Sequence, residues 1–195
     1  MTAPLAPTAR RDLYALVARL LGEELDAPLY HRLLSTQSDG LRWIEPELAE
    51  LPSERVLEVL DTEYCRLFLG PVPQCPPYAS VLRGEAVLGG RARSRVDDFF
   101  AAYGLAVDAH ARIASSDHVA VAFATLAELA AEDAITTWLR DFVAPWVPRW
   151  ISELETKTER QLYRTVAHIG SALVASDQAH YLRDSEAFGF EVQPQ

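Results

Sequence analysis

Apolar residues recur at helical spacing along most of this chain, and that pattern limits the fold more than any other feature. Two stripes are clear, over residues 8 to 21 and 53 to 69. They comprise Leu13, Leu16, Val17, Leu20, Leu21, Val56, Leu57, Leu60, Tyr64, Leu67 and Phe68. Such spacing places side chains on one helical face. No segment longer than about five residues alternates apolar and polar residues as a strand does. The sequence therefore predicts an all-α fold.

Cap and stop signals divide the remainder into further helices. We expect helices over 29–34, 91–103, 116–131, 135–143, from Pro145–Pro148 onward, and from Thr158 to about Val174, with a further turn near 179–182. Ser53 is an expected N-cap, Thr158 to Gln161 has capping-box spacing, and Gly22 and Gly104 are expected helix ends. Between 70 and 90 the chain is proline-rich and irregular, longer than the usual connection between helices. The prediction is one helical-bundle domain, 1–195, with a long proline-rich loop.

Charge and composition exclude several classes of function. The formal net charge of −10 disfavours a sequence-independent nucleic-acid binder, which needs a basic surface. No window reaches the roughly 18 apolar residues of a membrane span, and the N-terminus lacks the uninterrupted apolar stretch of a signal peptide. Cys65 and Cys75 fit no metal or redox spacing and suit a reducing compartment. We expect a cytoplasmic protein without cofactor or metal.

Signs of catalysis are weak. Asp117 and His118 are adjacent at an expected helix start, where they either contact a ligand or merely satisfy backbone N–H groups. The chain has no GxSxG elbow, no P-loop and no HExxH motif. The arginines of the 83–95 segment could hold an anion, although scattered solvated guanidinium groups are commoner. The Trp146/Trp150 pair is more typical of a core. The sequence favours a protein that is not an enzyme.

The segment EYCRLFLGPVPQCPPYASV, residues 63–81, joins an aromatic helix end to a run of prolines. One interpretation is a packed helix end beneath a stiff loop. The other is a slot between that loop and Tyr64, Leu67 and Phe68, into which an apolar segment settles. Glu54, Glu58 and Asp61 follow i, i+4, i+7 spacing on the same helix and would attract a segment that is also basic.

Four ordered motifs resemble the TorD/DmsD family of cytoplasmic chaperones. They are Tyr64-Cys65-Arg66-Leu67-Phe68-Leu69-Gly70-Pro71, Pro76-Pro77-Tyr78-Ala79-Ser80-Val81, Ser116-Asp117-His118-Val119, and the Trp138–Trp150 stretch WLRDFVAPWVPRW. The resemblance implies an all-helical chaperone that binds the twin-arginine signal peptide or apo form of a molybdenum-cofactor oxidoreductase and delays its export until the cofactor is inserted. It implies peptide-binding or hinge roles for Tyr64, Leu67, Phe68, Pro77, Tyr78, Asp117 and His118.

Alternatives remain open at this point. A nitrate-reductase delta-type assembly chaperone is a close relative, and a nucleotide hydrolase using Asp117 and His118 or a helical scaffold belongs to another class. The family's Asp-His motif commonly follows Glu-Pro, whereas Ala114-Ser115 stands here. This departure weakens the transfer of the guanine-nucleotide binding suggested for some members and leaves that binding open. A monomer and a helix-exchanged homodimer are both compatible with the sequence.

Overall fold

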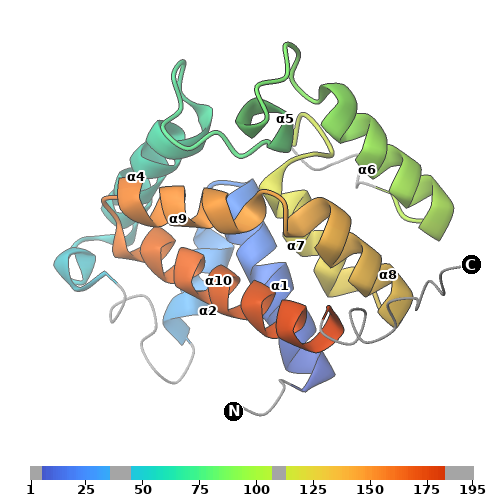
Figure 1. Ribbon diagram of the computed structural model, residues 1–195. Helices are drawn as coiled ribbons and strands as arrows, with labels where there is room; N and C mark the ends of the chain where they lie inside the picture. Colours follow the sequence, from blue (N-terminus) through green and yellow to red (C-terminus); the bar gives the residue numbers. More distant parts are fainter. Residues whose placement is uncertain (1–5, 36–44, 107–112, 183–195) are drawn as a thin grey trace, which may run out of the picture.

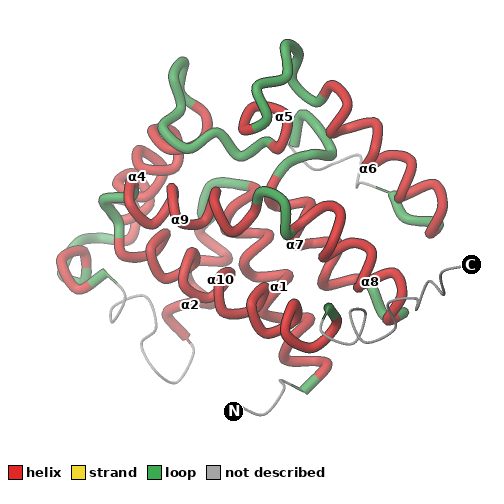
Figure 2. Tube along the Cα trace, in the orientation of Figure 1, coloured by secondary structure: helices red, strands yellow, loops and turns green. Residues whose placement is uncertain are grey.

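The computed structural model describes residues 6–35, 45–106 and 113–182, and these ranges contain helices and loops without a strand (Figure 2). Only a two-residue antiparallel bridge joins Tyr78 to His118 within them. The helices are α1 (Pro7–Gly22), α2 (Ala27–Ser35), η1 (Pro46–Leu48), α4 (Ser53–Tyr64), η2 (Cys65–Leu69), α5 (Ala79–Leu82), α6 (Gly90–Tyr103), α7 (Val119–Glu128), α8 (Glu132–Trp138), η3 (Leu139–Val143), α9 (Val147–Lys157) and α10 (Gln161–Tyr181). The predicted all-α class is confirmed.

Helix α1 lies at the centre of the bundle and packs against α7 and α10 (Figure 1). Helices α9 and α10 pack side by side, and α5 packs against α6. The apolar stripe of α1 forms part of the core, where Tyr14 and Val17 are almost completely buried. Trp150 is also fully buried and Trp146 nearly so, which confirms the core interpretation of this pair.

Helices α4 and α8 each end in a π-helical turn, a feature that the sequence did not predict. Gly70 N donates to Cys65 O at 2.7 Å, and Ala144 N donates to Leu139 O at 2.8 Å. Each bond spans five residues instead of four, which rotates the last side chains relative to the helix before them. Gly70 then ends η2, as expected from the Gly-Pro pair.

Several predicted helix ends are wrong. The N-cap of α4 is Pro52, so Ser53 is already helical. The N-cap of α10 is Arg160, and the acceptor for Leu162 N is the carboxylate of Glu45, at 2.6 Å, instead of a capping box. Helix α10 continues unbroken past the end expected near 174. Gly104 does adopt the left-handed conformation, with φ of 67°.

The irregular region predicted between 70 and 90 is divided in the structure. Helix α5 separates the segment 70–78 from the segment 83–89. Residues 36–44 and 107–112 lie outside the described residues.

Candidate functional site

The predicted slot at the end of α4 is filled by the protein itself. Tyr64, Leu67 and Phe68 are 2%, 0% and 3% exposed. The Phe68 ring lies 6.0 Å from that of Trp150 and 5.7 Å from that of Tyr163, between α9 and α10. The prediction that these side chains line an open slot is wrong, because the last helices of the chain cover this face.

The proline segment and the Asp-His pair are joined directly. Val119 N donates to Pro77 O at 2.8 Å, and Ala79 N donates to Asp117 O at 3.0 Å. The ring of Tyr78 meets that of His118 edge-on at 4.9 Å. Pro77 is buried, whereas Tyr78 is half-buried. These contacts fix the chain that enters α7.

His118 and Asp117 serve the backbone. His118 Nδ1 accepts from Ala120 N at 3.0 Å and so caps α7, while Asp117 Oδ2 accepts from Ser80 N at 2.8 Å. Burial lowers the pKa of His118 to about 4, so the ring is neutral near pH 7. A ring with so low a pKa takes up a proton poorly, and its Nδ1 is engaged as a cap, which argues against a hydrolase that uses His118 as its general base.

The acidic residues of α4 differ in their surroundings. Glu54 and Glu58 are exposed, and Glu58 forms an ion pair with Arg55. Asp61 is half-buried, and its Oδ1 has no donor among the described residues. Burial and the charge of Glu24 raise the pKa of the Asp61 carboxyl. Cys65 follows Asp61 by one helical turn, and its Sγ lies 3.5 Å from Glu24 Oε1, so Glu24 and Asp61 are neighbours. We call them the carboxylate pair, to which a cation would bring a favourable partner.

An open apolar groove lies on a different face from the predicted slot, between α1, α7 and the end of α6. Its volume is about 240 Å³. We call it the α1–α7 groove. Its lining is mostly small or aliphatic and includes Ala18, Gly22, Leu105, Ile113, Ala120 and Ala124. Glu23 and Glu128 stand on its rim, and Glu23 directly precedes the Glu24 of the carboxylate pair.

Small residues make this groove. Helices α1 and α7 approach so closely that a Cβ on Gly22 would meet the Cβ of Ala120 at 3.0 Å. Gly22 was predicted as a helix stop, but it is the last helical residue and its role is this close approach. The sequence analysis missed the groove and Glu24. The available signal was the alanine-rich run that begins α7, which we interpreted only as helix.

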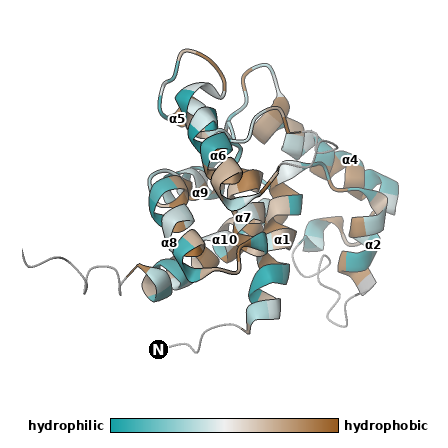
Figure 3. Cartoon of the chain, turned by 90° about the vertical axis from the view of Figure 1, so that its right-hand side faces the viewer, coloured by the Kyte–Doolittle hydropathy of each residue, from teal (hydrophilic) through white to brown (hydrophobic). Residues whose placement is uncertain are grey.

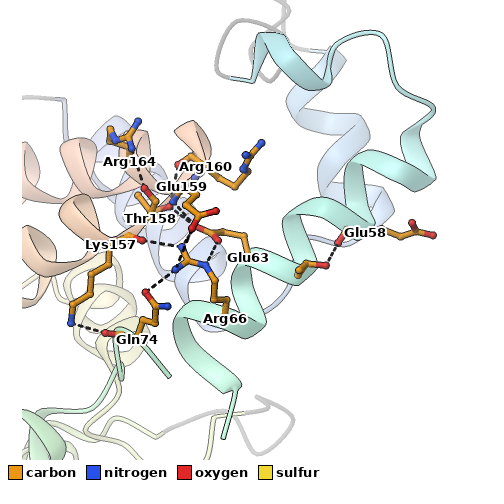
Figure 4. A network of polar contacts seen from close by, with 10 residues as sticks. Glu58, Glu63, Arg66, Gln74, Lys157, Thr158, Glu159, Arg160 and Arg164 are labelled. Atoms are coloured by element: carbon orange, nitrogen blue, oxygen red, sulfur yellow. Dashed lines mark hydrogen bonds and ion pairs between the residues drawn. The ribbon is translucent and has the colours of Figure 1, made fainter. Parts of the chain in front are cut away.

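A polar network holds α4 against the turn between α9 and α10 (Figure 4). The buried carboxylate of Glu63 accepts from Arg66 Nε at 2.7 Å, from Thr158 Oγ1 at 2.9 Å and from Glu159 N at 2.7 Å. Burial alone would raise the pKa of Glu63, but these donors outweigh it and lower that pKa. The network sets the position of the helix end that carries Tyr64 and Phe68.

The structure is thus an all-helical one with an apolar groove and carboxylates on its rim. Comparisons with known proteins identify its family. The family model described as nitrate reductase delta subunit matches residues 35–153. The chain belongs to this TorD/nitrate reductase delta family and is a redox enzyme maturation chaperone. The family is one of chaperones, not of enzymes.

Individual relatives agree with that placement. The chaperone protein TorD of Shewanella piezotolerans is 29% identical over 87% of this chain and 90% of its own length. TorD of Shewanella sp. strain MR-4 is 28% identical over 87% of this chain and 92% of its own length. A crystal structure from Archaeoglobus fulgidus, described as a candidate redox enzyme maturation protein, has a TM-score of 0.55. It is 23% identical and covers 90% of this chain and 96% of its own, which supports the fold.

None of the helices in the described ranges is long and apolar enough to cross a membrane.

Proposed function

We propose that this chaperone binds the twin-arginine signal peptide of a molybdenum-cofactor oxidoreductase in the cytoplasm and retains the apo-enzyme until its cofactor is inserted. The observation that carries the proposal is the α1–α7 groove, together with the carboxylate pair, in which Glu24 directly follows the rim residue Glu23 in the sequence. A twin-arginine signal peptide is basic at its start and apolar in its middle. Each part of such a peptide therefore has a complementary surface here.

The apolar part of the peptide is assigned to the groove. The α7 side of the groove includes Ala120 and Ala124. Because α7 is packed against α1, this wall is formed before a ligand arrives. A preformed apolar wall spares the ordering cost that a flexible site would incur on binding.

We assign the two arginines of the signal peptide to the carboxylate pair, Glu24 and Asp61. Arg19 partly neutralises the rim, because it pairs with Glu23 at 3.4 Å and with Asp26 at 2.8 Å. Asp61 has no such partner in the described structure. A guanidinium beside Asp61 would offset the desolvation that raises its pKa, so ionised Asp61 favours binding.

The motif residues then act mainly by positioning. Asp117, His118 and Pro77 fix the start of α7, whose next turns line the groove. Tyr64, Leu67 and Phe68 support α4 from within the core. Tyr78 is the most accessible aromatic of the set, and we assign it a contact to the client, on a segment that its prolines keep stiff.

The curated relatives favour the TorD branch over the delta-type branch. Three TorD proteins match over 86–87% of this chain, whereas the delta-subunit model spans residues 35–153. A client exported by the twin-arginine route accords with the TorD branch.

A single substitution in the groove wall tests the site. Ala124 is exposed, so Ala124→Trp fills the groove without disturbing the core, and we expect a leader peptide to bind at least about tenfold more weakly. The measurement is calorimetric titration with a synthetic twin-arginine leader of a molybdoenzyme. Ala172→Trp, at an exposed alanine of α10 that does not line the groove, is the matched control. Equal affinities for the two variants would move the site elsewhere.

A further inference from the structure

The loop between α5 and α6 exposes aliphatic side chains that serve neither the core nor the groove. Val87 is 69% exposed, Leu88 is 49% exposed, and Val81 at the end of α5 is 44% exposed. The loop rises above α5 at one end of the molecule (Figure 1), and its apolar residues are brown in Figure 3. Single exposed aliphatic residues are common, but two at one loop tip with a third on the helix before it are typical of an interaction site.

This loop is held in one shape. Gly84 and Gly89 adopt φ of 67° and 86°, a backbone conformation that residues with a side chain rarely adopt. Ser80 ties both ends, because its O accepts from Glu85 N at 3.0 Å and its Oγ accepts from Gly89 N at 2.9 Å. The carboxylate of Glu85 accepts from Arg91 N at 2.7 Å. The exposed tip is therefore presented on a fixed base, and little conformational freedom is lost when it is covered.

Positive charge surrounds the same loop. Arg83 and Arg91 are exposed, and no carboxylate lies within ion-pair distance of either side chain in the described ranges. Arg93 pairs with Asp97 at 3.3 Å, and Arg95 lies over the ring of Phe142 at 5.3 Å. Arg83 and Arg91 outnumber Glu85, the acidic residue between them in the sequence, so this surface is positive in a chain of net charge −10.

We propose that this surface, Val81, Arg83, Val87, Leu88 and Arg91, docks an acidic and apolar protein segment of the client enzyme outside its leader. The basic leader is excluded by charge, since Arg83 and Arg91 would repel its arginines. Glu85 already occupies the start of α6, so a small anion would have to displace it. Identifying the partner as the client rests on the proposed function. The chaperone then holds one client at two surfaces of opposite charge, which raises the effective affinity.

Two double variants test this second surface. Arg83→Glu/Arg91→Glu reverses its charge, and Val87→Ser/Leu88→Ser removes its apolar tip. The probe is the leaderless apo catalytic subunit of the molybdoenzyme whose leader is used above. We expect each double variant to bind it at least about tenfold more weakly than wild type, with unchanged affinity for the isolated leader peptide. Arg55→Glu/Arg149→Glu makes the same change of charge at exposed arginines elsewhere and should retain the affinity.

The outcomes separate this proposal from the proposed function. If the leaderless subunit does not bind wild type, or binds the reversed and control variants equally, the second surface is refuted even where the leader binds. If the leader fails to bind while the leaderless subunit still discriminates among the variants, the signal-peptide assignment fails and the second surface stands. Dissociation of a wild-type dimer by either double variant, seen by sedimentation, would assign the loop to self-association and overturn the proposal.

Discussion

Phe68→Ala is expected to lower the free energy of unfolding by about 3–5 kcal/mol, because it leaves a cavity among Tyr64, Trp150 and Tyr163. Urea denaturation followed by helical circular dichroism measures the loss. The neighbouring Leu69→Ala is the control, because Leu69 is 59% exposed and its removal should change stability by less than about 0.5 kcal/mol.

The milder substitution Phe68→Leu, which keeps an apolar side chain in the core, separates stability from binding. We expect it to fold and to bind the leader peptide with unchanged affinity, since Phe68 lies in the core and not in the groove. Comparable destabilisation by Leu69→Ala and Phe68→Ala, or loss of leader binding by folded Phe68→Leu, would contradict this placement.

Glu63→Ala is expected to cost about 2–4 kcal/mol, because it removes the acceptor of buried donors and one partner of an ion pair. Thr158 Oγ1 and Glu159 N lose their acceptor, while Arg66 keeps its bonds to Gln74 and to Lys157 O. Thermal and urea unfolding measure the change. Glu58→Ala on the same helix removes only an exposed ion pair and should stay within about 0.5 kcal/mol of wild type. An equal effect of both variants would show that the network in Figure 4 does not secure α4.

Local patterns predicted the helices well because their signals lie within each segment. The stripe of α1, the Gly70 end of η2 and the left-handed Gly104 all depend on neighbours a few residues away. The capping of α10 could not be predicted in this way, because the acceptor for Leu162 N is Glu45, which lies 117 residues away in the sequence. The spacing of residues along the sequence gives no information on a contact between residues so far apart.

The site was harder to predict for the same reason. Helical periodicity identified the face with Tyr64 and Phe68 but could not say that α9 and α10 would cover it. The open groove arises where small residues such as Gly22, Ala120 and Ala124 meet, and small residues on a stripe also suit close packing. Asp61 was predicted as an attractor of arginines, but its neighbour Glu24 comes from another helix end.

Cross-linking to Cys65 tests the central claim most directly. This thiol is exposed and lies beside the carboxylate pair, with its Sγ 3.5 Å from Glu24 Oε1, whereas Cys75 is buried. A leader peptide with one cysteine next to its arginine pair should form a disulfide with Cys65 under mild oxidation, identified by peptide mapping and lost in Cys65→Ser. A cysteine at the far end of the apolar stretch should react much less. Equal cross-linking from both peptide positions, or none from a peptide that still binds, would contradict the assignment of the arginines to Glu24 and Asp61.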